Sequence, residues 1–130
     1  MIVLDASVLI AVLTPEDAHH RVALAMFTRA VGAAQDFLVN TVTLAEALVL
    51  PTQQGRVEEQ STAIAELGVV EVPFPRGAAR TLARLRVDTG LKLPDCIVLL
   101  TALDQRGTLA TFDDRLRRAS LDQGVPLQPR

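Results

Sequence analysis

Tryptophan and tyrosine are absent from this sequence, and cysteine occurs once, at Cys96. A single thiol excludes an internal disulfide framework and a cysteine-based zinc site. Long hydrophobic runs are missing too, and a membrane-spanning helix needs roughly 18 consecutive apolar residues. The opening segment, Met1 to Asp5, lacks the basic start and the small-residue cleavage site of a signal peptide. We therefore expect a cytoplasmic protein that does not associate with a membrane.

An excess of positive charge is also missing. The chain has 13 Lys and Arg against 15 Asp and Glu, for a net charge of −2, and this balance argues against a general nucleic-acid-binding surface. If four of the carboxylates hold a metal ion, the rest of the surface becomes slightly basic. All basic residues except one are arginines, which suit bidentate phosphate contacts. A compositional bias of the genome explains the arginines equally well, so composition permits a phosphate-bearing substrate without requiring one.

Hydrophobic periodicity divides the chain into short strands alternating with helices. We expect strands over 2–4, 37–39, 69–72, 109–112 and 125–127, and helices over 8–13, 15–31, 42–50, 57–67, 75–89, 94–106 and 114–121. The second helix is predicted to start with Thr14 as its N-cap and Pro15 at its first position. The helix over 94–106 is apolar on all sides and is expected to be buried. This alternation predicts one α/β domain over residues 1–130, in which helices flank both faces of a mostly parallel sheet of about five strands.

Four acidic residues fall where such a sheet would gather them. Asp5 follows the first expected strand and Asp113 the fourth, Asp95 opens the apolar helix, and Glu46 lies on an otherwise apolar helix face after the second strand. Binding crevices lie beyond the carboxyl ends of parallel strands. Carboxylate oxygens suit hard cations such as Mg²⁺ or Mn²⁺, which activate water and offset charge in phosphodiester hydrolysis. Without a cation, clustered carboxylates repel one another and their pKa values rise.

Each acid also has a simpler explanation. Asp5, Asp95 and Asp113 stand where aspartate commonly caps a helix. Glu46 is the hardest to explain in this way, because a carboxylate on an apolar face must be protonated, paired or metal-bound. The combination of all four favours a metal-dependent nuclease over four separate structural roles.

Other chemistries have little support in the sequence. His19 and His20 are adjacent and cannot form an i, i+4 metal pair, so we expect both to be solvated. Cys96 is expected to be a small core residue. No serine lies in a glycine-framed nucleophile elbow, and no glycine-rich phosphate loop is present.

Basic residues accompany the acids. Arg76, Arg80 and Arg84 recur every four residues after the third expected strand, and Lys92 and Arg115 stand close to the third and fourth acids. One interpretation is a solvated helix face. The other is an RNA-contacting surface that leads to the acidic pocket, with contacts from Arg80, Arg84, Lys92 and Arg115. Because aromatic residues are few, recognition is expected to rest on phosphates and RNA shape.

Four short motifs, in this order, resemble those of the PIN-domain nucleases. They are Asp5-Ala6-Ser7, Thr43-Leu44-Ala45-Glu46, Leu93-Pro94-Asp95 and Leu109-Ala110-Thr111-Phe112-Asp113. Their order and the small size of the chain are most similar to the VapC-type toxins of bacterial toxin–antitoxin pairs, and the resemblance covers essentially the whole chain. It implies a doubly wound PIN fold, an endoribonuclease dependent on Mg²⁺ or Mn²⁺, a homodimer, and a cognate antitoxin that wraps the toxin.

Carried over position by position, the resemblance makes Asp5, Glu46, Asp95 and Asp113 the metal-binding, catalytic acids. Ser7 and Thr111 match hydroxyl residues that support the acids, and Asp114 matches a neighbour that is less regularly involved. Phe112 stands where the family often has Asn or Ser, so the hydrogen bonding beside Asp113 is expected to differ.

Three alternatives remain open. The chain could be a PIN-type RNA-processing nuclease without an antitoxin, or a catalytically silent PIN domain that only binds. It could also be a phospho-receiver-like module that uses Asp5, although its only lysine, Lys92, is misplaced for that chemistry.

Overall fold

The computed structural model describes residues 1–130 in full. Its elements, in chain order, are β1 (Ile2–Leu4), α1 (Ala6–Leu13), α2 (His20–Gly32), β2 (Phe37–Asn40), α3 (Thr41–Gln53), α4 (Val57–Glu66), β3 (Val69–Val72), α5 (Ala78–Thr89), α6 (Leu93–Gln105), β4 (Thr108–Ala110), α7 (Asp114–Asp122) and β5 (Leu127–Gln128). The five strands form one sheet in the order β3-β2-β1-β4-β5. Every neighbouring pair is parallel. The predicted parallel α/β architecture is confirmed.

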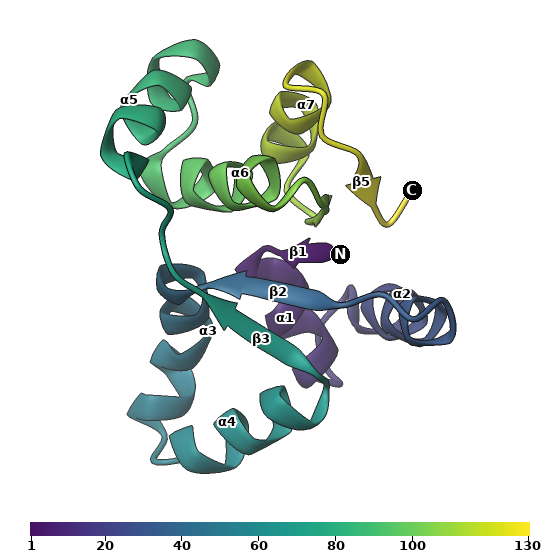
Figure 1. Ribbon diagram of the computed structural model, residues 1–130. Coiled ribbons are helices and arrows are strands. Elements are labelled where there is room, and N and C mark those ends of the chain that lie inside the picture. The colour runs from purple at the N-terminus through teal and green to yellow at the C-terminus, as the bar shows by residue number, and fades with distance from the viewer.

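Alternate side chains of the strands enter two different cores, one on each face of the sheet. Ile2 and Leu4 of β1 pack with residues of α1 to α4, whereas Val3 between them packs with residues of α5, α6 and α7. Figure 1 shows the resulting layers, with α6 and α7 on one side of β1 and β2 and with α1 and α3 on the other. The two-residue period of a strand explains this division.

Helix α6 fills the core on its face of the sheet, as its apolar sequence predicts. Every residue from Cys96 to Ala102 is buried. The thiol of Cys96 lies 3.5 Å from the Leu91 carbonyl oxygen, and burial raises its pKa, so Cys96 is the core residue that we expected. None of the helices, α6 included, has the length and apolar composition needed to cross a membrane.

The segment between α1 and α2 differs from the sequence-based prediction. Thr14 and Pro15 do not start a helix; α2 begins at His20. The backbone N–H of Asp17 donates to the Thr14 carbonyl at 2.9 Å, so residues 14–17 form a β-turn with Pro15 at its second position. A fixed proline φ suits that position as well as the first turn of a helix. Thr14 is already the C-cap of α1, and the chain must reverse there for α2 to pack on α1.

Helix α3 extends beyond its predicted end. It includes Pro51, which is buried, and continues to Gln53. A proline removes only its own N–H from the helix, and the next bonds persist, because the N–H of Gln54 donates to the Leu50 carbonyl at 3.0 Å. The prediction that the helix ends before Pro51 is therefore wrong.

Other boundaries shift by two or three residues. Helix α5 begins at Ala78 and not at Pro75, which leaves Arg76 outside it. Strand β4 ends at Ala110, so Phe112 lies in the connection to α7, and β5 occupies 127–128 and not 125–127. The earlier end of β4 falls at the start of residues 110–113, where the candidate site lies.

Candidate active site

Asp5 directly follows β1 at the carboxyl edge of the sheet, and both oxygens of its buried carboxylate accept hydrogen bonds. Its Oδ1 accepts the backbone N–H of Ala6 at 2.9 Å, as the N-cap of α1. Its Oδ2 accepts hydroxyl hydrogens from Ser7 at 2.9 Å and from Thr111 at 2.7 Å. Helix capping therefore accounts for the hydrogen bond of one carboxylate oxygen, whereas the other oxygen accepts two side-chain hydroxyls that play no part in the cap. Hydrogen bonds of this kind hold a carboxylate in one orientation.

Thr111 connects this carboxylate to the end of β4. Its hydroxyl is fully buried; it donates to Asp5 and accepts the backbone N–H of Asp113 at 3.0 Å. Asp113 caps α7 through Oδ1, which accepts the N–H of Leu116 at 2.9 Å. The connection is possible because β1 and β4 pair in register, with Leu4 opposite Ala110. Two of the predicted acids thus sit side by side on neighbouring strand ends.

Asp95 lies in the first turn of α6 but does not cap it, because Lys92 holds the N-cap position. Its pKa is raised by partial burial above all, and further by the negative charges of Asp5 and Asp113. The cations Arg115 and Lys92 oppose that increase. The two strand-end aspartates and the two predicted basic neighbours are therefore all close enough for their charges to act on Asp95.

Glu46 also faces the cluster, but not from a buried surface. Its pKa is raised by partial burial first, then by Asp5 and by Asp95. Its helix face is apolar, but the expectation that this face is not solvated is wrong, since Glu46 is exposed and so are Val49 and Leu50 further along the helix. Helix α3 turns Thr43 and Ala47 inward, which leaves Glu46 at the surface.

Among the four predicted acids, Glu46 and Asp95 thus have pKa values raised first by burial and further by acidic neighbours. The all-oxygen donor set of the four acids fits a hard divalent ion by its chemistry. In the structure, no three acidic, histidine or cysteine side chains are arranged to hold an ion between them. The identity of the metal ligands stays a prediction.

The remaining predicted residues lie in three different places. Lys92 and Arg115 lie near Asp95, as described above. Arg80 and Arg84 lie exposed on α5, where Arg84 pairs with Asp88 at 3.5 Å, and no contact links either of them to the acids. Asp114 opens α7, is exposed and forms no side-chain hydrogen bond with the chain.

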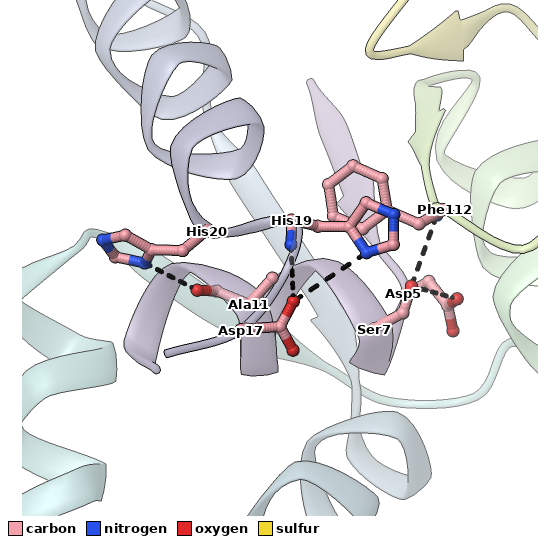
Figure 2. Close-up of polar contacts among 7 residues, drawn as sticks. All are labelled: Asp5, Ser7, Ala11, Asp17, His19, His20 and Phe112. Atoms are coloured by element: carbon pink, nitrogen blue, oxygen red, sulfur yellow. Dashed lines mark hydrogen bonds and ion pairs between the residues drawn. The ribbon is translucent and has the colours of Figure 1, made fainter. Parts of the chain in front are cut away.

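The sequence led us to expect that both histidines are solvated, but each ring makes a contact within the chain. The ring of His20 is partly buried, and its Nδ1 lies 2.8 Å from the Ala11 carbonyl oxygen. The ring of His19 stacks on Phe112, with 4.3 Å between the ring centroids. Figure 2 shows that the two rings point in opposite directions and that only His19 lies toward Asp5. Adjacency in the sequence predicted this divergence but not the stacking partner, which is distant along the chain.

Asn40 and Thr43 were missed by sequence reasoning as polar groups of interest. Asn40 caps α3 by accepting the N–H of Val42 on Oδ1 at 2.8 Å, and an asparagine directly before a helix was a signal for this. Its Nδ2 and the hydroxyl of Thr43 are buried without hydrogen-bond partners. Both lie where β2 ends and α3 begins, and Thr43 precedes Glu46 by one helical turn.

Comparison with known proteins identifies the family and agrees with the fold. The model of the PIN domain family matches residues 2–121, and no curated protein sequence is significantly similar. One similar structure is a toxin–antitoxin complex from Klebsiella pneumoniae, 24% identical over 87% of each chain with a TM-score of 0.69. Another is the sarcin–ricin loop cleaving toxin VapC20 of Mycobacterium tuberculosis, 14% identical over 92% of this chain and 95% of that chain, with a TM-score of 0.71. A third is VapBC2 of Rickettsia felis bound to a promoter DNA fragment, 12% identical over 98% of each chain, with a TM-score of 0.76.

Such low identities establish a shared fold, whereas the family match extends over nearly the whole chain. The resemblance inferred from the four motifs is confirmed: this chain belongs to the PIN domain family.

Proposed function

We propose that this protein is a metal-dependent endoribonuclease and the toxin of a toxin–antitoxin pair. Membership of the PIN family supports a nuclease activity in general. The proposal of a metal-dependent ribonuclease rests on the cluster of acidic side chains near the strand ends. There Asp5 is fixed by two hydroxyls, and the pKa values of Asp95 and Glu46 are raised by burial and by their acidic neighbours. Such a group gains most from a divalent cation, because the cation removes the repulsion among the carboxylates.

In this proposal Asp5, Glu46, Asp95 and Asp113 hold Mg²⁺ or Mn²⁺. The bound ion supplies an activated water and offsets charge on the scissile phosphate. The chain itself orients a ligand carboxylate and attracts the RNA. Ser7 and Thr111 keep the Asp5 carboxylate in a fixed orientation, and the cations Lys92 and Arg115 beside Asp95 attract the RNA backbone. Hydrolysis then adds water to the phosphorus as the bond to the leaving ribose oxygen breaks.

A protein partner is proposed for the same side of the molecule. Ile10 and Leu50 are exposed apolar residues, and with Glu46 they line a surface hollow of about 390 Å³. Exposed apolar surface next to a site is typical of a protein interface. The similar Klebsiella structure is a toxin–antitoxin complex, which supports a cognate antitoxin as the partner. We propose a homodimer as the second assembly of this chain, on the basis of its resemblance to VapC-type toxins.

The first experiment is cleavage of total cellular RNA by purified protein, with Mg²⁺ or Mn²⁺ and with EDTA. We expect discrete fragments that require metal and disappear with Asp95→Asn. The matched control is Asp104→Asn, because Asp104 lies on the same helix but is exposed and lies near its other end. Fragments that persist with EDTA or with Asp95→Asn contradict the proposal. An absence of cleavage by folded, antitoxin-free protein in both metals favours a catalytically silent PIN domain.

A PIN-type RNA-processing nuclease is the second candidate, since the same acids would serve it. A small open reading frame that overlaps or abuts this gene, and whose product copurifies with the chain and inhibits cleavage, favours the toxin. Cleavage that no neighbouring gene product inhibits favours the processing nuclease.

A further inference from the structure

An aromatic pair that the proposed chemistry does not use stands beside the carboxylates. The rings of His19 and Phe112 lie face to face, with 4.3 Å between centroids and 12° between planes (Figure 2). Phe112 is partly buried and packs against the core formed by β1 and α1 to α4. His19 is the outer layer of the stack, and 55% of its side chain is exposed. One face of the imidazole is therefore covered by Phe112, and the ring remains open to solvent.

The backbone places this stack next to the acids. Phe112 directly precedes Asp113, and its N–H donates to the Ser7 hydroxyl at 3.4 Å. The Ser7 hydroxyl in turn donates to Oδ2 of Asp5 at 2.9 Å. Figure 2 shows this chain of contacts running from the ring pair to the Asp5 carboxylate. A group resting on His19 would thus lie close to a phosphate bound at the acids.

The orientation of the imidazole is set by its neighbours. Oδ1 of Asp17 accepts the backbone N–H of His19 at 2.8 Å and lies 3.8 Å from the ring Nδ1. Asp17 is itself fixed by the turn over residues 14–17, where its N–H donates to the Thr14 carbonyl. The ring is therefore restrained on one edge by Asp17 and on one face by Phe112. A ring held in this way loses little conformational entropy when a ligand stacks on it.

We propose that the stack of His19 on Phe112 is a base-binding platform, on which a nucleobase next to the scissile phosphate rests against the open face of His19. The inference rests on the proposed ribonuclease function and narrows its substrate to RNA with an unstacked base, as in a single strand or a loop. Stacking accepts any base, because every base presents a π-face.

No other aromatic pair of the chain offers this role. Phe27 and Phe37 stack on each other, but both are buried in the core. Phe74 is partly exposed and stands alone in the connection between β3 and α5.

Binding is tested in an Asp95→Asn background, which is expected not to cleave. The probe is a short single-stranded RNA that contains aminopurine, a fluorescent base that is quenched when it stacks. We expect His19→Ala to weaken binding by about 5- to 150-fold, the range that loss of one stacked base produces, and to abolish the quenching. His19→Phe is expected to keep both. His20→Ala is the matched control, because it removes the adjacent ring, which points away from the site.

Cleavage kinetics distinguish a role of His19 in substrate binding from a merely structural role. In the active protein we expect His19→Ala to raise KM by a similar factor with a smaller change in kcat. An abasic nucleotide at the quenched position should raise KM for the wild type and have little further effect on His19→Ala. If His19 were only structural, His19→Ala would lower the melting temperature and the abasic substitution would affect both proteins alike, which would overturn the proposal.

The outcomes distinguish this inference from the proposed function. If the wild type cleaves RNA and His19→Ala binds and cleaves equally well, the platform is refuted and the ribonuclease stands. If the wild type cleaves nothing in either metal, the ribonuclease is refuted. Quenching that is lost with His19→Ala then still supports base binding, and a lack of RNA binding or of quenching refutes it.

Discussion

Replacement of Thr111 by valine tests the connection between the two strand-end aspartates. The substitution keeps the shape of a fully buried side chain and removes only its hydroxyl. That hydroxyl donates to Oδ2 of Asp5 at 2.7 Å and accepts the N–H of Asp113 at 3.0 Å. Thr111→Val therefore takes one donor from a buried carboxylate and one acceptor from a backbone amide at once.

The expected cost follows from these two contacts. A hydrogen bond to a charged group contributes about 1.5–3 kcal/mol, and a neutral one about 1 kcal/mol. Ser7 continues to donate to the same oxygen of Asp5, so the carboxylate keeps one of its two donors. We expect the free energy of unfolding to fall by about 2–4 kcal/mol. With an unfolding entropy of about 2 cal/mol/K per residue, this corresponds to a decrease in Tm of about 7–15 °C.

The assay is denaturant and thermal unfolding of the metal-free protein, with Thr101→Val as the matched control. Thr101 is also buried, but its hydroxyl donates to the Ile97 carbonyl within helix α6. That carbonyl keeps its helical hydrogen bond after the substitution, so we expect a loss of less than about 1 kcal/mol. Equal losses for the two variants would refute the special role of Thr111.

A second test uses Asp5→Asn, which removes the negative charge to which the Thr111 hydroxyl donates its hydrogen bond. In this background the cost of Thr111→Val should shrink by about 1 kcal/mol, because a hydrogen bond to a neutral amide is weaker. A cost unchanged by Asp5→Asn would show that Thr111 acts only through packing. Thr111→Val should also weaken Mn²⁺ binding by about 10- to 100-fold, as loss of a partner that orients a ligand does. Titration calorimetry measures that change.

Three further predictions concern the perturbed groups. Because the pKa of Asp95 is raised in part by Asp5 and Asp113, Asp95→Asn should raise the Tm of the metal-free protein at neutral pH and lose the gain in Tm that Mg²⁺ gives the wild type. Because the pKa values of Glu46 and Asp95 are raised, their contribution to stability is present at low pH, where both are protonated, and is lost as the pH rises through the raised values. This pH dependence is checked by measuring, as a function of pH, the difference in unfolding free energy between the wild type and the Glu46→Gln/Asp95→Asn variant. Burial raises the pKa of Cys96, so a thiol reagent should modify the native protein slowly and the denatured protein quickly, and fast native modification would contradict the packing of α6.

The parts of the site that the sequence predicted are those fixed by strand ends. Asp5 and Asp113 each follow an apolar run, and a parallel sheet brings such positions to one edge whatever the details of packing. Asp95 was predictable as well, because it lies at the start of a helix whose apolar sequence indicates burial, and every residue from Cys96 to Ala102 is buried. The supporting hydroxyl of Thr111 came from the family resemblance, since no local pattern indicates a hydrogen bond between residues 106 positions apart.

The features that were missed depend on tertiary packing. Glu46 shares its helix with Val49 and Leu50, and the sequence could not tell whether that apolar face was covered. The Thr14–Asp17 turn carries the same residues as a helix start, and only the packing of α2 on α1 decides between the two. The contact of His19 with Phe112 depends on that turn, because a helix starting at Pro15 would have carried His19 elsewhere.

The four acids form two pairs that differ in how far hydrogen bonds restrain their side chains. Asp5 and Asp113 are fixed, because the carboxylate of each caps a helix, and the hydroxyl of Thr111 donates to the Asp5 carboxylate and accepts the backbone N–H of Asp113. Asp95 and Glu46 have no such partners, and their pKa values are raised by burial and by the acids they face. Entry of a cation would thus draw the second pair toward a first pair that is already in place. Because a raised pKa lets protons compete more strongly with a cation, acidification should weaken metal binding, and Thr111→Val should weaken it at every pH.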